Sequence, residues 1–295
     1  MTTDTKLRAL TSLNQTEYRK ILNVFSQRVS QKCSTMTLKG KRRVYRAYKE
    51  HGNSSLYGSH AKLDFILMYL KENPNQAYHG ACFGMTQSKV SEWVRFLLPV
   101  LQETLHHLGY MPQSMGRFKA NESYDYLLVD VTERIVPRRC DAEGQSEEYS
   151  GKKKLHTCKH LAIGDSAGYI HYMTPAYQGS IHDKTIWNDL NIQAMSINLL
   201  ADLGFQGAQH NHPNIILPYK TPKNAKLTDL QKQINQVINS LRVRIEHAFA
   251  GVKRLKIIRN KIRLRTEDVR DSVMMIATAL HNLRVDFRKP LISHS

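Results

Sequence analysis

A long helical stripe toward the end of the sequence limits how this chain can fold more than any other feature. From Thr228 onward, apolar residues recur at spacings of three and four, the periodicity of one face of an α-helix. The stripe consists of Ile234, Val237, Ile238, Leu241, Ile245, Ala248, Phe249, Val252 and Leu255. Arg242, Glu246 and Lys253 fall within about 40° of one another on its rim. We therefore expect a core-packed helix that holds Glu246 beside a cleft.

The neighbourhood of Glu246 is strongly cationic. Its basic neighbours are Arg242, Arg244, Lys253, Arg254, Lys256, Arg259, Lys261, Arg263 and Arg265. A single carboxylate among so many cations favours chemistry on a polyanion. The alternative is a solvated face on which Arg242 and Glu246 form an ordinary ion pair one helical turn apart.

The net charge narrows the class of partner. The 295 residues carry a formal charge of +18 with a pI near 9.8, which indicates nucleic acid or an anionic membrane surface. No apolar run approaches the roughly 18 residues of a membrane span, and residues 1–6 lack the apolar segment of a signal peptide. The four cysteines are scattered without metal-ligand spacing, which predicts reduced thiols and no zinc site. We expect a cytoplasmic nucleic-acid-binding protein with no membrane partner.

The N-terminal region is predicted to be helical. Helices are expected over residues 7–29, 61–71 and 76–83. A tight turn at residues 84–86 then precedes a helix that begins at Gln87, which is the helix-turn-helix arrangement. The alternative is a small three-helix bundle that does not read DNA.

The second helix of a helix-turn-helix places its first polar side chains in the major groove of DNA. Here these side chains are Gln87, Ser88, Lys89, Ser91 and Glu92. Thr86 is the expected N-cap of this helix, and Val90, Val94 and Leu97 are expected to face inward. The basic segment 31–58 is predicted to be either an arm on DNA phosphates or a solvated linker.

The rest of the chain has the pattern of a mixed sheet. Strands are predicted over residues 126–131, 152–163, 169–177, 197–202 and 214–218. A loop is expected over residues 138–151, and helices over residues 179–191 and 267–287. An antiparallel meander followed by one helical crossover gives an α/β (α+β) fold: a mixed five-stranded sheet flanked by helices, the RNase H-like arrangement.

Turn signals near residues 109–120 predict a division of the chain. We expect a helical DNA-binding region over residues 1–118, with its helix-turn-helix at about 55–108. The RNase H-like domain is then expected over residues 119–295.

Two carboxylates lie in or directly after predicted strands. Asp130 follows three apolar residues in a run that is predicted to be buried, and Asp202 ends the fourth strand. Each has the alternative role of a turn former at the end of a strand. A buried carboxylate is unfavourable by several kcal/mol unless it is paired or holds a metal. With Glu246, the two acids could converge at one end of the sheet, where Mg²⁺ and phosphate oxygens would complete the site.

These motifs together resemble the DDE transposases of bacterial insertion sequences, in the insertion-sequence-five-like group, whose nuclease domain is shared with PIF/Harbinger elements. The matching motifs are Asp130-Val-Thr-Glu133, Tyr149-Ser-Gly-Lys-Lys-Lys-Leu-His156, Gly179-Ser-Ile-His-Asp-Lys184, Leu200-Ala-Asp-Leu-Gly-Phe-Gln-Gly207 and the spaced set Arg242, Glu246 and Lys253. The resemblance covers residues 126–287. One departure is Asn239, which stands where the family often has a tyrosine with a positioning contact.

The resemblance implies Mg²⁺-dependent DNA recombination, with Mn²⁺ as a substitute metal. Asp130, Asp202 and Glu246 would be the catalytic residues and the metal ligands. The DNA-binding residues would be Gln87, Ser88, Lys89, Lys152, Lys153, Lys154, Lys159, Arg242 and Lys253, with His156 and His182 as further phosphate contacts. A solvated basic loop is the alternative for residues 152–154. The DNA would be the terminal inverted repeats of the element and its target, bound by a nucleoid-associated homodimer or larger assembly.

Two alternatives stay open. Asp183 rivals Asp202 as the second metal ligand, because it lies in a strong family motif. The topology favours Asp202, because the first and fourth strands of an RNase H-like sheet are neighbours, whereas Asp183 would cap a helix or orient Lys184 and His182. For the whole chain, the alternative to an active transposase is a catalytically silent, domesticated DNA-binding protein on the same scaffold.

Overall fold

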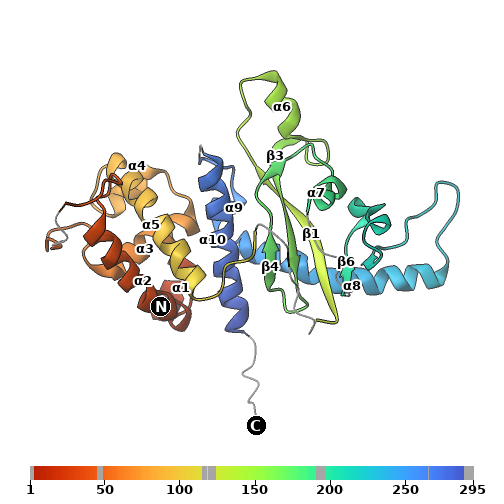
Figure 1. The fold of residues 1–295 in the computed structure, drawn as a ribbon, viewed down its shortest axis with the longest axis horizontal. Coiled ribbons are helices and arrows are strands. Elements are labelled where there is room, and N and C mark those ends of the chain that lie inside the picture. The colour runs from red at the N-terminus through yellow and green to blue at the C-terminus, as the bar shows by residue number, and fades with distance from the viewer. Residues whose placement is uncertain are drawn as a thin grey trace, which may run out of the picture. The chain divides into compact units, whose positions relative to one another are not determined.

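The computed structural model describes residues 3–44, 49–114, 118, 124–190, 197–264 and 266–288. Within these residues the chain forms two compact units (Figure 1). The first unit comprises residues 1–111, 253–260 and 268–295, and the second comprises residues 112–252 and 261–267. Each unit is defined by the contacts among its own residues. The domain boundary expected between residues 118 and 119 stays a prediction.

The first unit is all helical. Its helices are α1 (Thr3–Thr11), α2 (Gln15–Thr35), α3 (Gly58–Glu72), α4 (Gln76–Cys82), α5 (Gln87–His107), α9 (Lys256–Arg259) and α10 (Glu267–Asp286). The single helix predicted over residues 7–29 is wrong, because α1 ends at Thr11 and a capping box begins α2 after it. The side chain of Asn14 accepts the backbone N–H of Glu17, and the Glu17 carboxylate accepts that of Asn14.

The helix-turn-helix elements form where the sequence predicts them. Asn73 ends α3 in the left-handed conformation, and the hydroxyl of Thr86 caps α5 by accepting the N–H of Lys89 at 3.4 Å. The three α5 residues expected to face inward are buried: Val90, Val94 and Leu97.

The second unit contains the sheet and the helices α6, α7 and α8. Its elements are β1 (Tyr126–Ile135), α6 (Ala142–Glu148), β2 (Tyr149–Ser150), β3 (Leu155–Gly164), β4 (Ile170–Met173), β5 (Tyr177–Gln178), α7 (Asp183–Asp189), β6 (Asn198–Leu200), β7 (Ile215–Ile216) and α8 (Asp229–Val252). Two short 3-10 turns, η1 (Leu203–Phe205) and η2 (Ala208–His210), lie between β6 and β7. The loop predicted over residues 138–151 is wrong, because Asp141 caps α6 by accepting the N–H of Gly144 at 2.7 Å, and β2 follows at once.

The sheet confirms the predicted fold class. β3 pairs antiparallel with β1, β1 pairs in parallel with β6, and β6 pairs in parallel with β7. The outer edge of β3 carries β4 and the two-residue strands β2 and β5. The predicted meander, crossover and neighbouring first and fourth strands are therefore all present, with two short strands added.

The two faces of the sheet carry different layers. Leu127 and Val129 of β1 pack on one face with Trp187 of α7, in a cluster of buried side chains. Helix α8 runs along the other face (Figure 1). There a Cβ at Gly164 would lie 3.0 Å from Cδ1 of Ile245, so this glycine allows the close approach of strand and helix.

The apolar stripe of α8 is only partly buried. Five of its members are buried, as predicted: Ile238, Ile245, Ala248, Phe249 and Val252. Leu241 is only partly buried. Val237, however, is 59% exposed, because the N-terminal half of α8 extends past the edge of the sheet (Figure 1). The helix ends at Val252, so the helical angle predicted for Lys253 does not apply. None of the described helices is long and apolar enough to cross a membrane.

Candidate active site

The pairing of β1 with β6 brings two of the predicted acids to neighbouring strands. Leu128 pairs with Leu200 in parallel register, and Asp130 and Asp202 each follow two residues later. Side chains two residues apart on a strand point to the same face. Asp202 lies just beyond β6, where its Oδ1 accepts the N–H of Gly204 at 2.9 Å. The backbone therefore positions the Asp202 carboxylate at the end of the strand.

Asp130 faces helix α8. Oδ1 of Asp130 lies 3.8 Å from Nη2 of Arg242 and accepts the N–H of Val131 at 2.9 Å. Burial, with smaller contributions from the negative charges of Asp202 and Glu246, raises the pKa of Asp130 to about 6. The N–H of Val131 and the Arg242 guanidinium act in the opposite direction. Asp202 and Glu246 are thus each within electrostatic reach of Asp130.

Arg242 and Glu246 sit one turn apart on α8 but in different surroundings. The Arg242 side chain is buried, and its Nε has no hydrogen-bond partner among the described residues. Glu246 is exposed. The helix therefore presents a carboxylate to solvent and a guanidinium to the sheet, so Arg242 neighbours an acid where a phosphate contact was predicted.

The donor chemistry of the three acids suits a hard divalent cation. Carboxylate oxygens are the ligands that Mg²⁺ prefers. The pKa of Asp130 is raised mainly by burial, which leaves a desolvated carboxylate that a bound cation would stabilise in its charged form. Within the described part of the chain, no three His, Cys, Asp or Glu side chains are arranged closely enough to hold an ion. The carboxylate oxygens of the three acids are suitable ligands for Mg²⁺, and the structure gives no coordination geometry.

Asp183 lies beside Asp202 but is paired with the ammonium group of Lys159. Nζ of Lys159 donates to Oδ1 of Asp183 at 2.9 Å and to the carbonyl of Ile181 at 2.7 Å. A Cβ at Gly204 would lie within about 3 Å of both the Asp183 and the Asp202 carboxylates. Sequence reasoning missed the role of Gly204, although its place directly after Asp202-Leu203 was a signal that the turn there is tight.

This arrangement differs from the roles expected for Lys159 and Asp183. Lys159 is only 9% exposed, and its ammonium group donates two intramolecular hydrogen bonds. We had expected it to be exposed in a DNA channel. His182, not Asp183, is the N-cap residue of α7, so Asp183 does not cap the helix. Lys184, expected as a partner of Asp183, instead packs against Gly207.

The other predicted basic residues of this unit lie near its surface. Lys152, Lys153 and Lys154 are exposed in the turn between β2 and β3, and His182 is exposed at the start of α7. His156 packs edge-on against Tyr149 at 5.7 Å between ring centroids. Lys253 lies outside α8 and belongs to the first unit. DNA contact by these residues stays a prediction.

In the first unit, the predicted reading residues are exposed on the first turn of α5. Gln87, Ser88 and Lys89 all face solvent. Nε2 of Gln87 donates to the side-chain carbonyl of Gln76 at 2.7 Å, and Nζ of Lys89 pairs with Glu92 at 2.8 Å. These contacts orient the side chains without burying them, as an approaching DNA groove requires.

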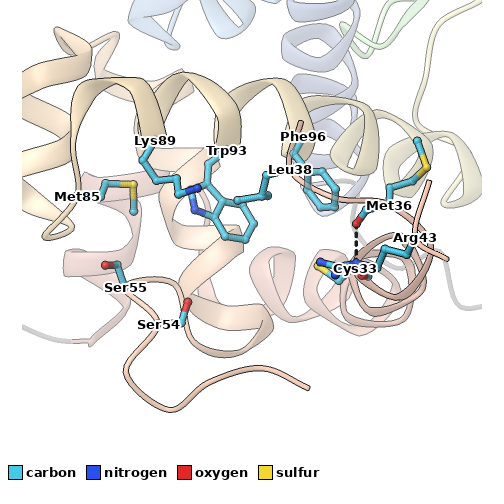
Figure 2. Close-up of a pocket in the computed structure, with 10 residues that line it drawn as sticks. All are labelled: Cys33, Met36, Leu38, Arg43, Ser54, Ser55, Met85, Lys89, Trp93 and Phe96. Atoms are coloured by element: carbon cyan, nitrogen blue, oxygen red, sulfur yellow. Dashed lines mark hydrogen bonds between the residues drawn. The ribbon is translucent and has the colours of Figure 1, made fainter. Parts of the chain in front are cut away.

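A cavity of about 260 Å³ lies against the same helix (Figure 2). It is lined by Cys33, Met36, Leu38, Arg43, Ser54, Ser55, Met85, Lys89, Trp93 and Phe96. Nε of Arg43 donates to the carbonyls of Cys33 and Met36 at 2.8 and 3.1 Å. The described part of the basic segment 31–58 therefore folds against α5, while its residues 45–48 lie outside the described residues.

A helix-turn-helix unit joined to an acid-bearing mixed sheet is the combination expected of a DNA-processing nuclease. Residues 129–282 match the family of DDE superfamily endonucleases, and residues 55–106 match the helix-turn-helix of DDE superfamily endonucleases. The chain belongs to this family. The resemblance inferred from the motifs is thereby confirmed.

Two curated relatives share most of their length with this chain. A probable transposase for insertion sequence element IS702 from Microchaete diplosiphon is 27% identical over 68% of this chain and 71% of its own length. A putative transposase for insertion sequence element IS112 from Streptomyces albus G is 24% identical over 74% of this chain and 77% of its own length. No solved structure matches the chain.

Proposed function

We propose that this chain is the transposase of an insertion sequence, which cleaves DNA at the ends of its element and joins them to target DNA. The observation that carries this proposal is the position of Asp130 on β1, within electrostatic reach of both Asp202 at the end of β6 and Glu246 on α8. The names of the two relatives support the same activity.

The chemistry would proceed in two displacements at phosphorus. Water attacks a phosphodiester at the end of the element and releases a strand with a free 3′-hydroxyl. This hydroxyl then attacks a phosphodiester of the target DNA, displaces its 3′-oxygen and joins the strands. Bound Mg²⁺ would supply charge neutralisation at the phosphate and favour ionisation of the attacking oxygen.

The residues of the chain have separate tasks in this proposal. Asp130, Asp202 and Glu246 would hold the cation. Arg242 keeps the Asp130 carboxylate ionised, since its charge lowers a pKa that burial raises. Lys159 neutralises the charge of Asp183 through their ion pair, which makes Asp183 a weaker ligand for the cation than Asp202.

Double-stranded DNA would approach the first unit through α5. Gln87 and Ser88 are exposed and would read base edges in the major groove, whereas the Lys89 ammonium would meet a phosphate. The excess positive charge of the chain also favours phosphates. Lys152, Lys153 and Lys154 would contact the backbone of DNA at the second unit.

The decisive variant is Glu246→Gln, which keeps the shape of the side chain and removes its charge. We expect cleavage of a DNA end in Mg²⁺ to be lost and DNA binding to persist. Asp229→Asn is the matched control, since it makes the same chemical change at an exposed position of the same helix.

The outcomes separate the proposal from its rival. Cleavage at the wild-type rate by Glu246→Gln would remove this residue from the active site. A wild-type chain that binds element ends yet never cleaves them in Mg²⁺ or Mn²⁺ would instead be the domesticated DNA-binding protein.

A further inference from the structure

The N-terminal half of α8 carries an apolar stripe that the sheet does not cover. Leu230 is 66% and Val237 is 59% exposed, and Ile234 and Leu241 are partly exposed. At 100° per residue these four side chains lie within about 60° of one another. They therefore form one narrow seam that runs from the first turn of α8 to Leu241. The N-terminal part of α8 extends beyond the sheet (Figure 1).

The spacing of the seam is the same in both directions. Its members follow one another at intervals of four, three and four residues, with leucine at each end and a β-branched residue at each inner position. Two such helices placed antiparallel about a two-fold axis put each Leu230 opposite a Leu241 and each Ile234 opposite a Val237. A surface that is complementary to itself in this way suits an isologous interface.

The distribution of charge favours a second copy of this chain over DNA as the partner of the seam. Residues 233–241 contain no ionisable side chain, in a protein of formal charge +18. Phosphates gain nothing from an uncharged apolar seam, whereas two strongly basic copies repel least where neither carries charge. The antiparallel register further brings Arg244 of one copy within about a turn of Asp229 of the other.

We propose that two copies of this chain associate through this seam, with their α8 helices antiparallel. Four side chains from each copy make a small contact, at the low end of the size of specific interfaces. We therefore expect a dissociation constant on the order of micromolar for the chain without DNA. The pairing does not depend on cleavage, so it stands or fails separately from the proposed function.

Sedimentation of the full-length chain without DNA or metal, over roughly 1–100 μM, tests the association. Val237→Glu would bury an unpaired charge against Ile234 of the other copy and should raise the dissociation constant at least about tenfold. Asn239→Glu introduces the same residue on the opposite, exposed side of the helix and should leave the dissociation constant unchanged. A wild-type chain that stays monomeric throughout, or equal effects of the two variants, would overturn the proposal.

Disulfide trapping tests the orientation even if Val237→Glu fails to fold. In a background with the exposed thiols Cys82 and Cys140 changed to serine, Ile234→Cys and Val237→Cys are made as separate single variants and mixed. The antiparallel seam predicts that the 234–237 disulfide forms between the two variants in preference to 234–234 and 237–237. Predominant 234–234 and 237–237 products would show a parallel pair and overturn the proposal.

Discussion

Asp130 and Asp202, at the carboxylate site in the second unit, are partly buried, whereas the polar side chains on the first turn of α5 in the first unit are exposed to water. The Asp130 side chain is 18% exposed, faces a buried guanidinium and has its pKa raised by burial. Gln87, Ser88 and Lys89 are exposed, so water competes for their hydrogen bonds. A polar group in low dielectric interacts strongly with every charge near it, whereas an exposed one is screened. The comparison teaches that one changed atom should matter far more at the carboxylate site than on α5.

The largest effect is expected at Asp202. Asp202→Asn keeps the bond from the Gly204 N–H and removes a charge from the proposed metal site, so we expect cleavage to fall by more than about 100-fold in a folded protein. Asp183→Asn should cost only about 10–100-fold, which leaves measurable activity, because this carboxylate already pairs with Lys159. Single-turnover cleavage of a labelled DNA end measures both variants.

The same pair of variants separates the two acids by stability. Asp183→Asn leaves the buried Lys159 ammonium without its counter-charge, so it should lower the free energy of unfolding by roughly 1–3 kcal/mol. Asp202→Asn breaks no ion pair recorded in the described residues and should change unfolding less. If Asp183→Asn abolished cleavage while Asp202→Asn retained it, the second ligand would be Asp183.

A smaller effect concerns the dependence of stability on pH in the metal-free protein. The pKa of Asp130 rises from 3.8 to about 6 on folding, so the folded state holds a proton that the unfolded state has released. This stabilisation is complete below pH 4 and is lost as the pH rises through 6, a change of about 3 kcal/mol. Urea unfolding in EDTA should show this decline for the wild type. Asp130→Asn should lose it, and the exposed-site control Asp229→Asn should keep it.

The strand pattern and its acids could be predicted from the sequence because both are local. Short apolar runs that end in turn residues predict β1, β3 and β6, and adjacency of the first and fourth strands brings Asp130 toward Asp202. The Lys159–Asp183 pair could not be predicted, because it joins residues 24 apart through a fold that sequence spacing does not describe. The two were assigned instead to DNA and to a helix cap.

The extent of burial along α8 could not be predicted from the sequence either. Periodicity shows that Val237 and Ile245 share one side of the helix, but not where the edge of the sheet falls between them. Between residues 11 and 15, by contrast, the signal was present and overlooked. Asn14 and Glu17 have the spacing of a capping box, which predicts the start of α2 within an otherwise continuous helical pattern.

The smallest effect is expected on the first turn of α5, where the comparison predicts graded losses. Gln87→Ala removes one contact to a base edge and should reduce discrimination between element ends and random DNA by about tenfold, since such contacts contribute roughly 1–3 kcal/mol. Lys89→Ala should weaken binding to both DNAs and lower the slope of log affinity against log salt by about 1, because it removes a contact to a phosphate. His107→Ala, exposed at the far end of the same helix, is the control that should change neither quantity. Binding is measured by fluorescence anisotropy with the full chain in EDTA, which prevents cleavage. Unaltered discrimination by Gln87→Ala, together with an unaltered salt slope for Lys89→Ala, would mean that another surface of the first unit reads the DNA.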